Sequence, residues 1–219
     1  MPDLGADINI DSLPRVLIVD ISANFGGANA RVLELMKGFP KNKIGLATLN
    51  NSSIAVELEH NGYVVHRLAS RKFDFRIPWR MVRIIRDNKY DILDTQNPQS
   101  KMWGSIAALL SGVKLVSTLN SWYMNEHPKF SVRWFVYSIL EFITNFKLSR
   151  YIVVSKQIQN DMVKIGISVK KIDLVYNAVN INSEIIKDSR WDLLHKYSLP
   201  EDAVLCLAAG RLVWAKAHD

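Results

Sequence analysis

The sequence predicts an α/β protein with a doubly wound parallel sheet and a Rossmann-like arrangement of helices on both faces. Short apolar runs alternate with segments whose apolar residues recur at helical spacing, as in βαβ units. The first run is apolar at every position between Arg15 and Asp20, as a strand buried on both faces requires. With 48% hydrophobic and 22% charged residues, the chain can form a substantial core.

The expected strands are short. They cover residues 15–20, 43–49, 63–68, 91–95, 113–118, 151–155 and 172–176. A first helix is expected where Val32, Leu35, Met36 and Phe39 recur at helical spacing. The other helices are expected at residues 54–60, 78–87, 99–110, 131–147 and 156–165. Pro78 suits the first turn of its helix, where a missing N–H group costs no hydrogen bond.

Changes in composition divide the chain into four parts. Residues 1–14 form a leader, residues 15–182 a complete domain, and residues 183–202 a polar and charged linker. Residues 203–219 begin with an apolar run, 203–209, that is expected to be a strand and leads into a basic turn. We therefore expect one complete domain followed by the truncated start of another.

The positive charge is concentrated in one segment. The chain has a net charge of +7, and residues 67–89 hold eight basic and two acidic residues. Such a segment attracts acidic lipid head groups, phosphorylated substrates or nucleic acid. A solvated helix face and an acidic membrane surface fit it equally well. Nucleic acid is not an expected partner, because no zinc-ligand spacing, helix-turn-helix or RNA-binding signature accompanies the charge.

The cysteine content and the apolar segments bear on the compartment. The single cysteine, Cys206, excludes a disulfide within the chain and favours a reducing environment. The N-terminus has no basic residue before Arg15 and no apolar core, so it is not a secretory signal. Residues 102–113 are too few to span a membrane, and charges interrupt residues 132–148. We expect a cytoplasmic protein, soluble or peripheral on the inner face of the cell membrane.

A glycine pair follows the first expected strand, at the edge of a parallel sheet where ligands bind. Gly26 and Gly27 stand before a helix, and exposed backbone N–H groups at such a turn would bind an anion. The glycine spacing matches neither the dinucleotide fingerprint nor a P-loop. A plain tight turn is the alternative.

Candidate substrate-binding residues follow four more strands. Their amide and hydroxyl groups are suited to sugar hydroxyls, and one indole is suited to stacking on a sugar ring. They are Gln96 and Asn97 after the fourth strand, Asn120 and Trp122 after the fifth, Ser155 after the sixth and Asn177 after the seventh. The alternatives are helix capping for the polar residues, a lid over the core for the tryptophan and a hinge at the last position.

Several familiar catalytic arrangements are missing from the sequence. It contains no Gly-x-Ser-x-Gly and no His-Glu-x-x-His, and one cysteine cannot form a thiolate metal site. None of the five histidines forms a metal-like pair. We therefore expect neither a metal nor another cofactor.

Taken in chain order, these turns resemble those of the family 4 glycosyltransferases, which have the GT-B fold. The matching segments are Gly26–Asn29, Asp94–Pro98, Thr118–Asn120, Val154–Ser155, Asn177–Asn180 and Gly210–Asp219. The order and spacing of these segments are more specific than any one of them. The resemblance extends from about Arg15 to the end of the chain.

The resemblance implies the N-terminal, acceptor-binding domain of a retaining enzyme that uses a nucleotide-sugar. In that family the sugar is transferred in a cleft between an acceptor domain and a donor domain, usually without a metal. By resemblance, Arg211 and Lys216 are the candidate catalytic residues that would bind the leaving diphosphate. Gly26 and Gly27 would face it across the cleft. The implied partners are a sugar or glycolipid acceptor and, where a donor domain is present, the nucleotide-sugar.

The chain departs from the family pattern at several motif positions. Asn120 stands where the family has a histidine, Gln96 where it often has one, and Asn29 where it has a glutamate. Ala178 and Ala217 replace motif glycines. An asparagine holds a sugar hydroxyl but is not a general base near neutral pH.

Three functions fit these observations. The first is the acceptor-side domain of a hexosyltransferase of surface polysaccharide, lipopolysaccharide or glycolipid biosynthesis. It is expected to be inactive alone, because the family's donor-domain carboxylates would lie beyond Asp219. The second, favoured by the replaced histidines, is a non-catalytic module that binds a glycan, a lipid or a protein partner. The third is another nucleotide-binding α/β protein, such as a sugar epimerase.

Overall fold

The structure is a computed structural model that describes residues 9–22, 25–122, 131–178 and 190–206. The chain forms two compact units, Met1–Ala178 and Val179–Asp219. The boundary falls inside the segment 177–180 that matches the family hinge, slightly before the predicted domain end at residue 182.

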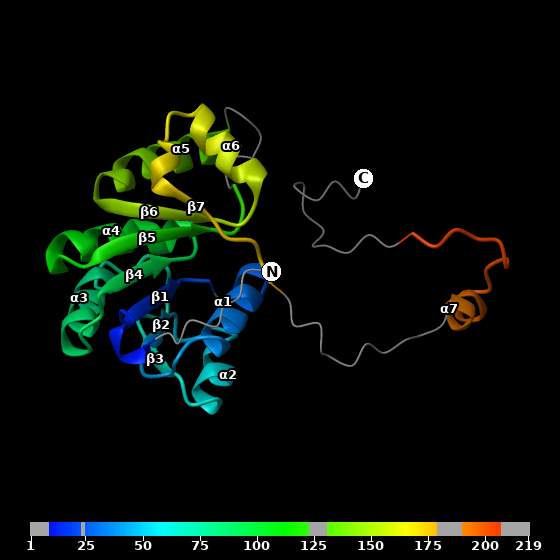
Figure 1. Cartoon of the computed structure of the whole chain (residues 1–219), viewed down its shortest axis with the longest axis horizontal. Helices are drawn as coiled ribbons and strands as arrows, with labels where there is room; N and C mark the ends of the chain where they lie inside the picture. The colour runs from blue at the N-terminus through cyan, green and yellow to red at the C-terminus, as the bar shows by residue number, and fades with distance from the viewer. Residues whose placement is uncertain (1–8, 23–24, 123–130, 179–189, 207–219) are drawn as a thin grey trace. The chain divides into compact units, whose positions relative to one another are not determined.

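A seven-stranded parallel sheet in the order β3-β2-β1-β4-β5-β6-β7 forms the centre of the first unit (Figure 1). The strands are β1 (Val16–Asp20), β2 (Ile44–Thr48), β3 (Val64–Arg67), β4 (Ile92–Thr95), β5 (Lys114–Leu119), β6 (Leu148–Val153) and β7 (Ile172–Leu174). The predicted doubly wound parallel sheet is confirmed. The strand order reverses between β1 and β4, where Val19 pairs with Thr95, so ligands are expected beyond these two strand ends.

Helices cover both faces of the sheet (Figure 1). They are α1 (Gly27–Lys37), α2 (Ala55–His60), α3 (Ile77–Asp87), α4 (Pro98–Ser111), α5 (Val132–Thr144) and α6 (Lys156–Lys164). Ile18 of β1 is buried with residues of α1 and α2, whereas its neighbours Leu17 and Val19 are buried with residues of α3, α4 and α6. Because successive side chains of a strand point to opposite faces, these two helix groups lie on opposite sides. Among the described residues, no helix combines the length and apolar character needed to cross a bilayer.

Capping residues explain where several helices begin. Asn97 caps α4, because its Oδ1 accepts a hydrogen bond from the Ser100 N–H at 2.8 Å while Ser100 Oγ accepts one from the Asn97 N–H at 3.0 Å. Ser155 caps α6 by accepting a hydrogen bond from the Ile158 N–H at 3.2 Å. Pro78 lies in the first turn of α3, as predicted. The capping roles of Asn97 and Ser155 are therefore confirmed.

The connection between α5 and β6 differs from the prediction. The helix expected at 131–147 ends at Thr144, and a 3₁₀ turn covers Asn145–Lys147. β6 begins at Leu148 rather than at residue 151. The hydrophobic pattern missed this start because Arg150 is exposed near the edge of the sheet, where it pairs with Asp173 of β7 at 3.1 Å.

The first helix buries most of the predicted face, since Val32 and Met36 are buried and Phe39 packs against them, but Leu33 takes the place of Leu35. It begins at Gly27, and Leu33 joins Val32 and Met36 in the core, whereas Leu35 is 36% exposed.

In the second unit, α7 (Arg190–Lys196) lies within the predicted linker 183–202. The described part of the strand predicted at 203–209, Ala203–Cys206, is not a strand. The described residues of this unit contain no strand with which the backbone of Ala203–Cys206 could pair.

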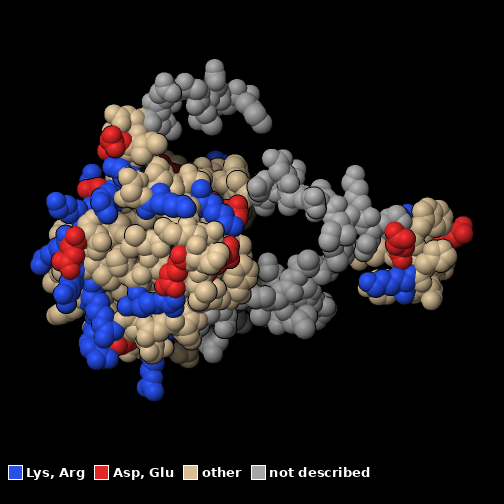
Figure 2. Space-filling view, turned by 90° about the horizontal axis from the view of Figure 1, so that it is seen from below, with Lys and Arg blue, Asp and Glu red and all other residues tan. Residues whose placement is uncertain are grey.

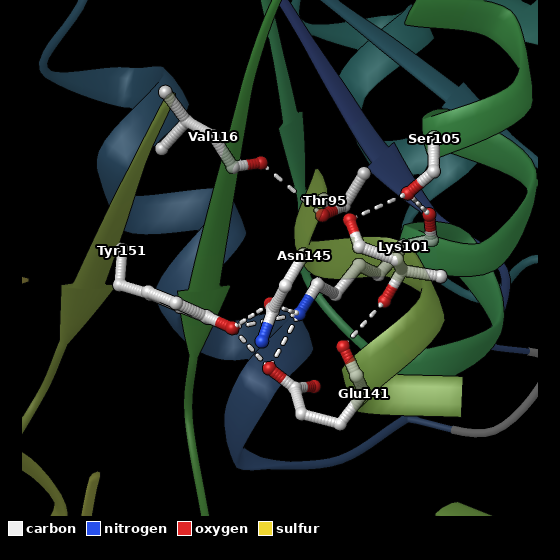
Figure 3. A network of polar contacts seen from close by, with 8 residues as sticks. Thr95, Lys101, Ser105, Val116, Glu141, Asn145 and Tyr151 are labelled. Carbon is white, nitrogen blue, oxygen red and sulfur yellow. Dashed lines mark hydrogen bonds and ion pairs between the residues drawn. The ribbon is translucent and has the colours of Figure 1, made fainter. Parts of the chain in front are cut away.

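A buried polar network joins α4, α5 and β6 (Figure 3). Lys101 Nζ lies 2.5 Å from Glu141 Oε1, 2.9 Å from the Tyr151 hydroxyl and 3.0 Å from Asn145 Oδ1. The Tyr151 hydroxyl also donates to Glu141. Lys101 is 2% exposed and Glu141 5%, so protein groups replace the water around both charges.

α4 approaches the sheet closely at Gly104. A Cβ atom there would lie 2.7 Å from the Cγ2 methyl of Thr95. This methyl is held in place because Thr95 Oγ1 donates to the Val116 carbonyl at 3.2 Å. We expect Gly104→Ala to lower the free energy of unfolding by about 1–3 kcal/mol, measured by urea denaturation.

The Thr95→Ser background provides the control for this prediction. Serine lacks the methyl and keeps the hydroxyl, so Gly104→Ala should cost little there, since alanine favours helix over glycine. Gly27→Ala, whose Cβ would meet no atom within 4 Å, should also be nearly neutral. Equal losses for Gly104→Ala in both backgrounds would contradict the proposed clash.

Candidate functional site

Polar side chains gather at the carboxyl edge of the sheet, around the point where the strand order reverses. Asp20 ends β1, Asp94 lies in β4 with Gln96 just after it, and Thr118 lies near the end of β5. These four side chains belong to residues that are at most 5% exposed. Because buried polar groups need hydrogen-bond partners, their contacts show how the edge is organised.

The Asp20 carboxylate joins the turn after β1 to the start of α4. It accepts hydrogen bonds from Ser22 Oγ at 2.6 Å, Asn29 Nδ2 at 2.6 Å and Asn97 Nδ2 at 2.8 Å. Burial raises the pKa of Asp20, although the hydrogen bonds from Ser22 and Asn97 and the nearby charge of Lys72 partly oppose the rise. Asp20 is therefore a structural anchor of this edge.

The contacts of Asn29 explain its departure from the family pattern. Its Nδ2 donates to Asp20 and also to Ser22 Oγ, at 2.9 Å. A carboxylate at position 29 would instead meet the Asp20 carboxylate, and two like charges in one buried site strongly raise the pKa of one of them. An amide at this position fits the buried Asp20.

Asp94 forms a second carboxylate cluster. Its Oδ1 accepts from Thr118 Oγ1 at 2.8 Å, and its Oδ2 accepts from Gln96 Nε2 at 2.8 Å. Burial raises the pKa of Asp94 to about 6, opposed in part by the hydrogen bonds and by the charge of Arg31. This carboxyl group therefore changes charge close to neutral pH.

Two buried polar atoms beside this cluster have no hydrogen-bond partner among the described residues. They are Nη1 of Arg31, on α1, and Oδ1 of Asn120, just after β5. Burial lowers the pKa of Arg31, while the charge of Asp94 opposes the shift. Asn120 Nδ2 lies 3.3 Å from Gln96 Oε1. Because such atoms are almost always paired, Arg31 and Asn120 mark where the hydrogen bonds of this edge are incomplete among the described residues.

The turn before α1 keeps backbone donors available. Gly26 is the N-cap residue of α1, and no side chain of the described residues caps this helix. The space beside Gly27 is open, because an added Cβ would meet no atom within 4 Å. The uncapped N–H groups fit the predicted anion site, which stays a prediction. No three His, Cys, Asp or Glu side chains of the described residues are placed to share a metal ion.

The structure brings some of the predicted binding residues together at this edge. Gln96 and Asn97 lie in the two carboxylate clusters, and Asn120 lies beside Gln96. Trp122 is only 7% exposed and belongs to the main buried cluster, which favours the core-lid interpretation over an open stacking face.

The remaining predicted residues lie elsewhere. Ser155 is occupied as the cap of α6, and Asn177 is exposed close to the end of the first unit. Arg211 and Lys216 are outside the described residues, so their predicted roles are untested.

Asp94 and Thr118 lie in segments that match the family pattern, but they were not named as candidate binding residues, and neither were Asp20 and Arg31. A signal for the two aspartates was present, because an acidic residue at the end of an otherwise apolar strand must be buried with partners. Arg31 gave no such signal, since the direction of its side chain depends on where α1 begins.

In Figure 1, α3 lies on the left of the first unit, and Figure 2 shows Lys and Arg side chains gathered on the same side. Several are paired: Arg67 lies 2.9 Å from Glu59, and Arg76 lies 2.9 Å from Asp74. The hydrogen bonds from Arg76 lower the pKa of Asp74 to about 2. Arg71 has no carboxylate partner among the described residues, so its charge is available to a ligand.

A comparison with protein families gives one match, to the family described as Glycosyltransferase Family 4, over residues 25–183. This range contains α1, the turns after β4 and β5, and every residue of the Asp94 cluster. A comparison with curated proteins finds no significant match.

Solved structures share the fold. Alr3699/HepE from Anabaena, in complex with UDP-glucose, has a TM-score of 0.67 and 17% identity over 85% of this chain and 49% of that one. The apo form of the lipopolysaccharide outer core galactosyltransferase WaaB has a TM-score of 0.55 and 18% identity over 82% of this chain and 50% of that one. The UDP-GlcNAc 2-epimerase of Methanocaldococcus jannaschii has a TM-score of 0.50 and 14% identity over 75% of this chain and 46% of that one. The chain thus spans about half the length of each, and at these identities the likeness concerns the fold alone.

Proposed function

The chain belongs to glycosyltransferase family 4, and we propose that it forms the acceptor-binding half of a hexosyltransferase that uses a nucleotide-sugar. The observation that carries this proposal is the pair of unpartnered buried atoms, Arg31 Nη1 and Asn120 Oδ1, inside the range that matches the family. One is a donor and the other an acceptor, which suits a hydroxyl group that both accepts and donates. The acceptor sugar would complete both hydrogen bonds.

Sugar transfer separates charge along the bond between the sugar and the diphosphate. Positive charge develops on the sugar and negative charge on the leaving diphosphate, which cations and fixed N–H groups stabilise. The uncapped turn at Gly26 and Gly27 would face the diphosphate, and Arg211 and Lys216 would bind it by family resemblance. We further propose retention of the anomeric configuration, with no metal or other cofactor. The complex of HepE with UDP-glucose supports a UDP-sugar as donor.

The proposal assigns donor binding to a second lobe. HepE and WaaB are about twice as long as the part of them that this chain matches. Family 4 chemistry takes place between two lobes, so turnover by this chain is expected only when a donor domain is supplied.

We place this activity in surface polysaccharide, lipopolysaccharide or glycolipid biosynthesis. WaaB, a lipopolysaccharide outer core galactosyltransferase of the same fold, supports this setting. The acceptor would then be reached at the inner face of the cell membrane, where the basic segment 67–89 would bind acidic lipids from the cytoplasmic side. Nucleic acid is not part of the proposal.

The test combines the purified chain with the separately purified donor domain of a family relative, UDP-sugars and candidate glycan or glycolipid acceptors. UDP release is expected only when both proteins and an acceptor are present, with or without a metal chelator. Arg31→Gln and Asn120→Leu should each lower kcat/KM about tenfold, the effect of one lost buried hydrogen bond. Lys164→Gln, at the exposed end of α6, should change nothing.

A non-catalytic binding module is the second candidate, supported by Asn120 and Gln96 in place of histidines. It predicts that the acceptor binds, that Arg31→Gln weakens this binding, and that no donor domain restores turnover. Conversion of a UDP-sugar to its epimer by the chain would contradict both candidates.

A further inference from the structure

A pocket of about 630 Å³ lies at the β2–β3 end of the same carboxyl edge. Asn50 and Ser70, which follow β2 and β3, line it together with the loop that leads into α3. Asn50 Nδ2 donates to Ser70 Oγ at 3.0 Å, and the Asn50 N–H donates to the Ala69 carbonyl at 2.9 Å. The wall of the pocket is therefore tied to the ends of two strands.

The pocket is positively charged. Three arginines line it, Arg71, Arg76 and Arg80, against one acidic residue, Asp74. Asp74 is already occupied by Arg76, at 2.9 Å, with Arg80 3.8 Å away. Arg71 has no carboxylate partner among the described residues, and the pocket keeps a net positive charge. Guanidinium groups in this arrangement suit a phosphate, which accepts several hydrogen bonds at once.

Exposed aromatic rings accompany these arginines. Phe73 is 68% exposed, Phe75 82% and Trp79 64%, and all three lie within one short segment of the chain. Phe73 and Phe75 line the pocket, and the Phe75 ring meets Trp103 of α4 edge-on at 5.9 Å between centroids. Phe73 and Phe75 therefore give the pocket an exposed apolar wall beside its arginines.

Arginines interleaved with exposed aromatic rings are typical of surfaces that hold an amphiphile at the membrane interface. Neither feature alone specifies this ligand. A free anion would need the arginines but not the rings, and a neutral glycan would need the rings but not the unpaired Arg71. A phosphate attached to an apolar chain uses both.

We propose that this pocket binds the phosphate group of a phosphorylated lipid, with the first part of its apolar chain against Phe73 and Phe75. That this lipid carries the acceptor sugar rests on the proposed function. The loop also reaches the candidate site, because the charge of Lys72 acts on Asp20 and the Lys72 carbonyl accepts a hydrogen bond from Trp103 Nε1 at 2.9 Å. A lipid held here would present its head group along the carboxyl edge of the sheet.

Calorimetric titration of the purified chain with monomeric short-chain phosphatidate tests the inference. Arg71→Gln and Phe73→Ser are expected to weaken binding about tenfold or more, since each removes one of the two contacts. Both side chains are exposed, and circular dichroism confirms that the variants fold. Arg83→Gln, which removes an equal charge from α3 outside the pocket, should stay within about twofold of the parent chain.

Two further ligands distinguish the source of the binding. Inorganic phosphate should bind at least about tenfold more weakly than the short-chain phosphatidate, because it cannot use the rings. The second test uses vesicles of matched surface charge that contain either phosphatidate or phosphatidylserine. Arg71→Gln should bind phosphatidate vesicles more weakly than Arg83→Gln does, whereas the two variants should bind phosphatidylserine vesicles equally well.

Three results would overturn the inference: no binding of the monomeric lipid, equally tight binding of inorganic phosphate, or equal losses for Arg71→Gln and Arg83→Gln. The last result would show general attraction to an acidic surface. Lipid binding without any sugar transfer in the two-protein assay would count against the proposed function and leave the pocket assignment standing.

Discussion

Replacing Lys101 by methionine is expected to lower the free energy of unfolding of the first unit by about 3–5 kcal/mol, the usual cost of removing one member of a buried ion pair. Glu141 would keep its carboxylate in a site that is 5% exposed. The Tyr151 hydroxyl would remain its nearby donor, but a neutral group cannot replace the ammonium that lies 2.5 Å away. Urea denaturation followed by tryptophan fluorescence measures the loss.

Two matched variants show whether the loss of the ion pair causes this destabilisation. The double variant Lys101→Met, Glu141→Leu removes both charges and should recover most of the stability, because an apolar pair needs no desolvation of ions. Arg83→Gln breaks an exposed pair with Asp87, at 3.4 Å, and should cost at most about 1 kcal/mol. If the double variant were as unstable as Lys101→Met, the packing of the lysine stem would explain the loss instead of its charge.

The pKa shifts of Lys101 and Tyr151 show how strongly both groups depend on the Glu141 carboxylate. Burial lowers the pKa of Lys101, and the neighbouring Glu141 charge raises it, with burial the larger effect. Burial and the same carboxylate raise the pKa of Tyr151, which therefore stays protonated and acts as a donor. The ion pair between Lys101 and Glu141 is therefore the strongest link between α4 and α5 in this network.

The architecture could be predicted because it depends on periodicity. Apolar runs of strand length alternated with helical spacing throughout the first unit, and Asn97, Ser155 and Pro78 marked helix starts correctly. The start of β6 was predicted three residues too late, because the exposed Arg150, near the edge of the sheet, interrupts the run of apolar residues in this strand. Pattern alone cannot show which strands lie at an edge.

The site was harder to predict than the fold, for a physical reason. Its position followed from the rule for parallel sheets, and Gln96, Asn97 and Asn120 were named from their places after strands. The ends of two apolar strands mark Asp20 and Asp94 as acidic residues that must be buried, but the side chains that they bind become evident only from the hydrogen bonds. The Lys101–Glu141 pair is separated by 40 positions in the chain, so no local pattern could join its members.

Asp94→Asn is expected to change the pH dependence of stability. The pKa of Asp94 is about 6 in the folded chain and 3.8 as the ordinary value, so the folded state holds this proton more tightly than the unfolded state. Its contribution is therefore fully present below about pH 4 and is lost as the pH rises towards 6. At 1.36 kcal/mol for each unit of difference between the two pKa values, the parent chain should lose about 2–3 kcal/mol relative to Asp94→Asn between pH 4 and pH 7.

The comparison isolates Asp94 because both chains share every other titrating group. The pKa of Asp20 is also raised by burial, but its effect cancels in the difference between the two proteins. Asp87→Asn, an exposed carboxylate on α3, should follow the parent chain within about 0.5 kcal/mol over the same range. A difference between the parent chain and Asp94→Asn that stayed constant from pH 4 to pH 7 would contradict the raised pKa. The same titration changes the candidate site, because ionised Asp94 neutralises Arg31 and favours a neutral hydroxyl ligand, whereas protonated Asp94 leaves a cation that favours an anion.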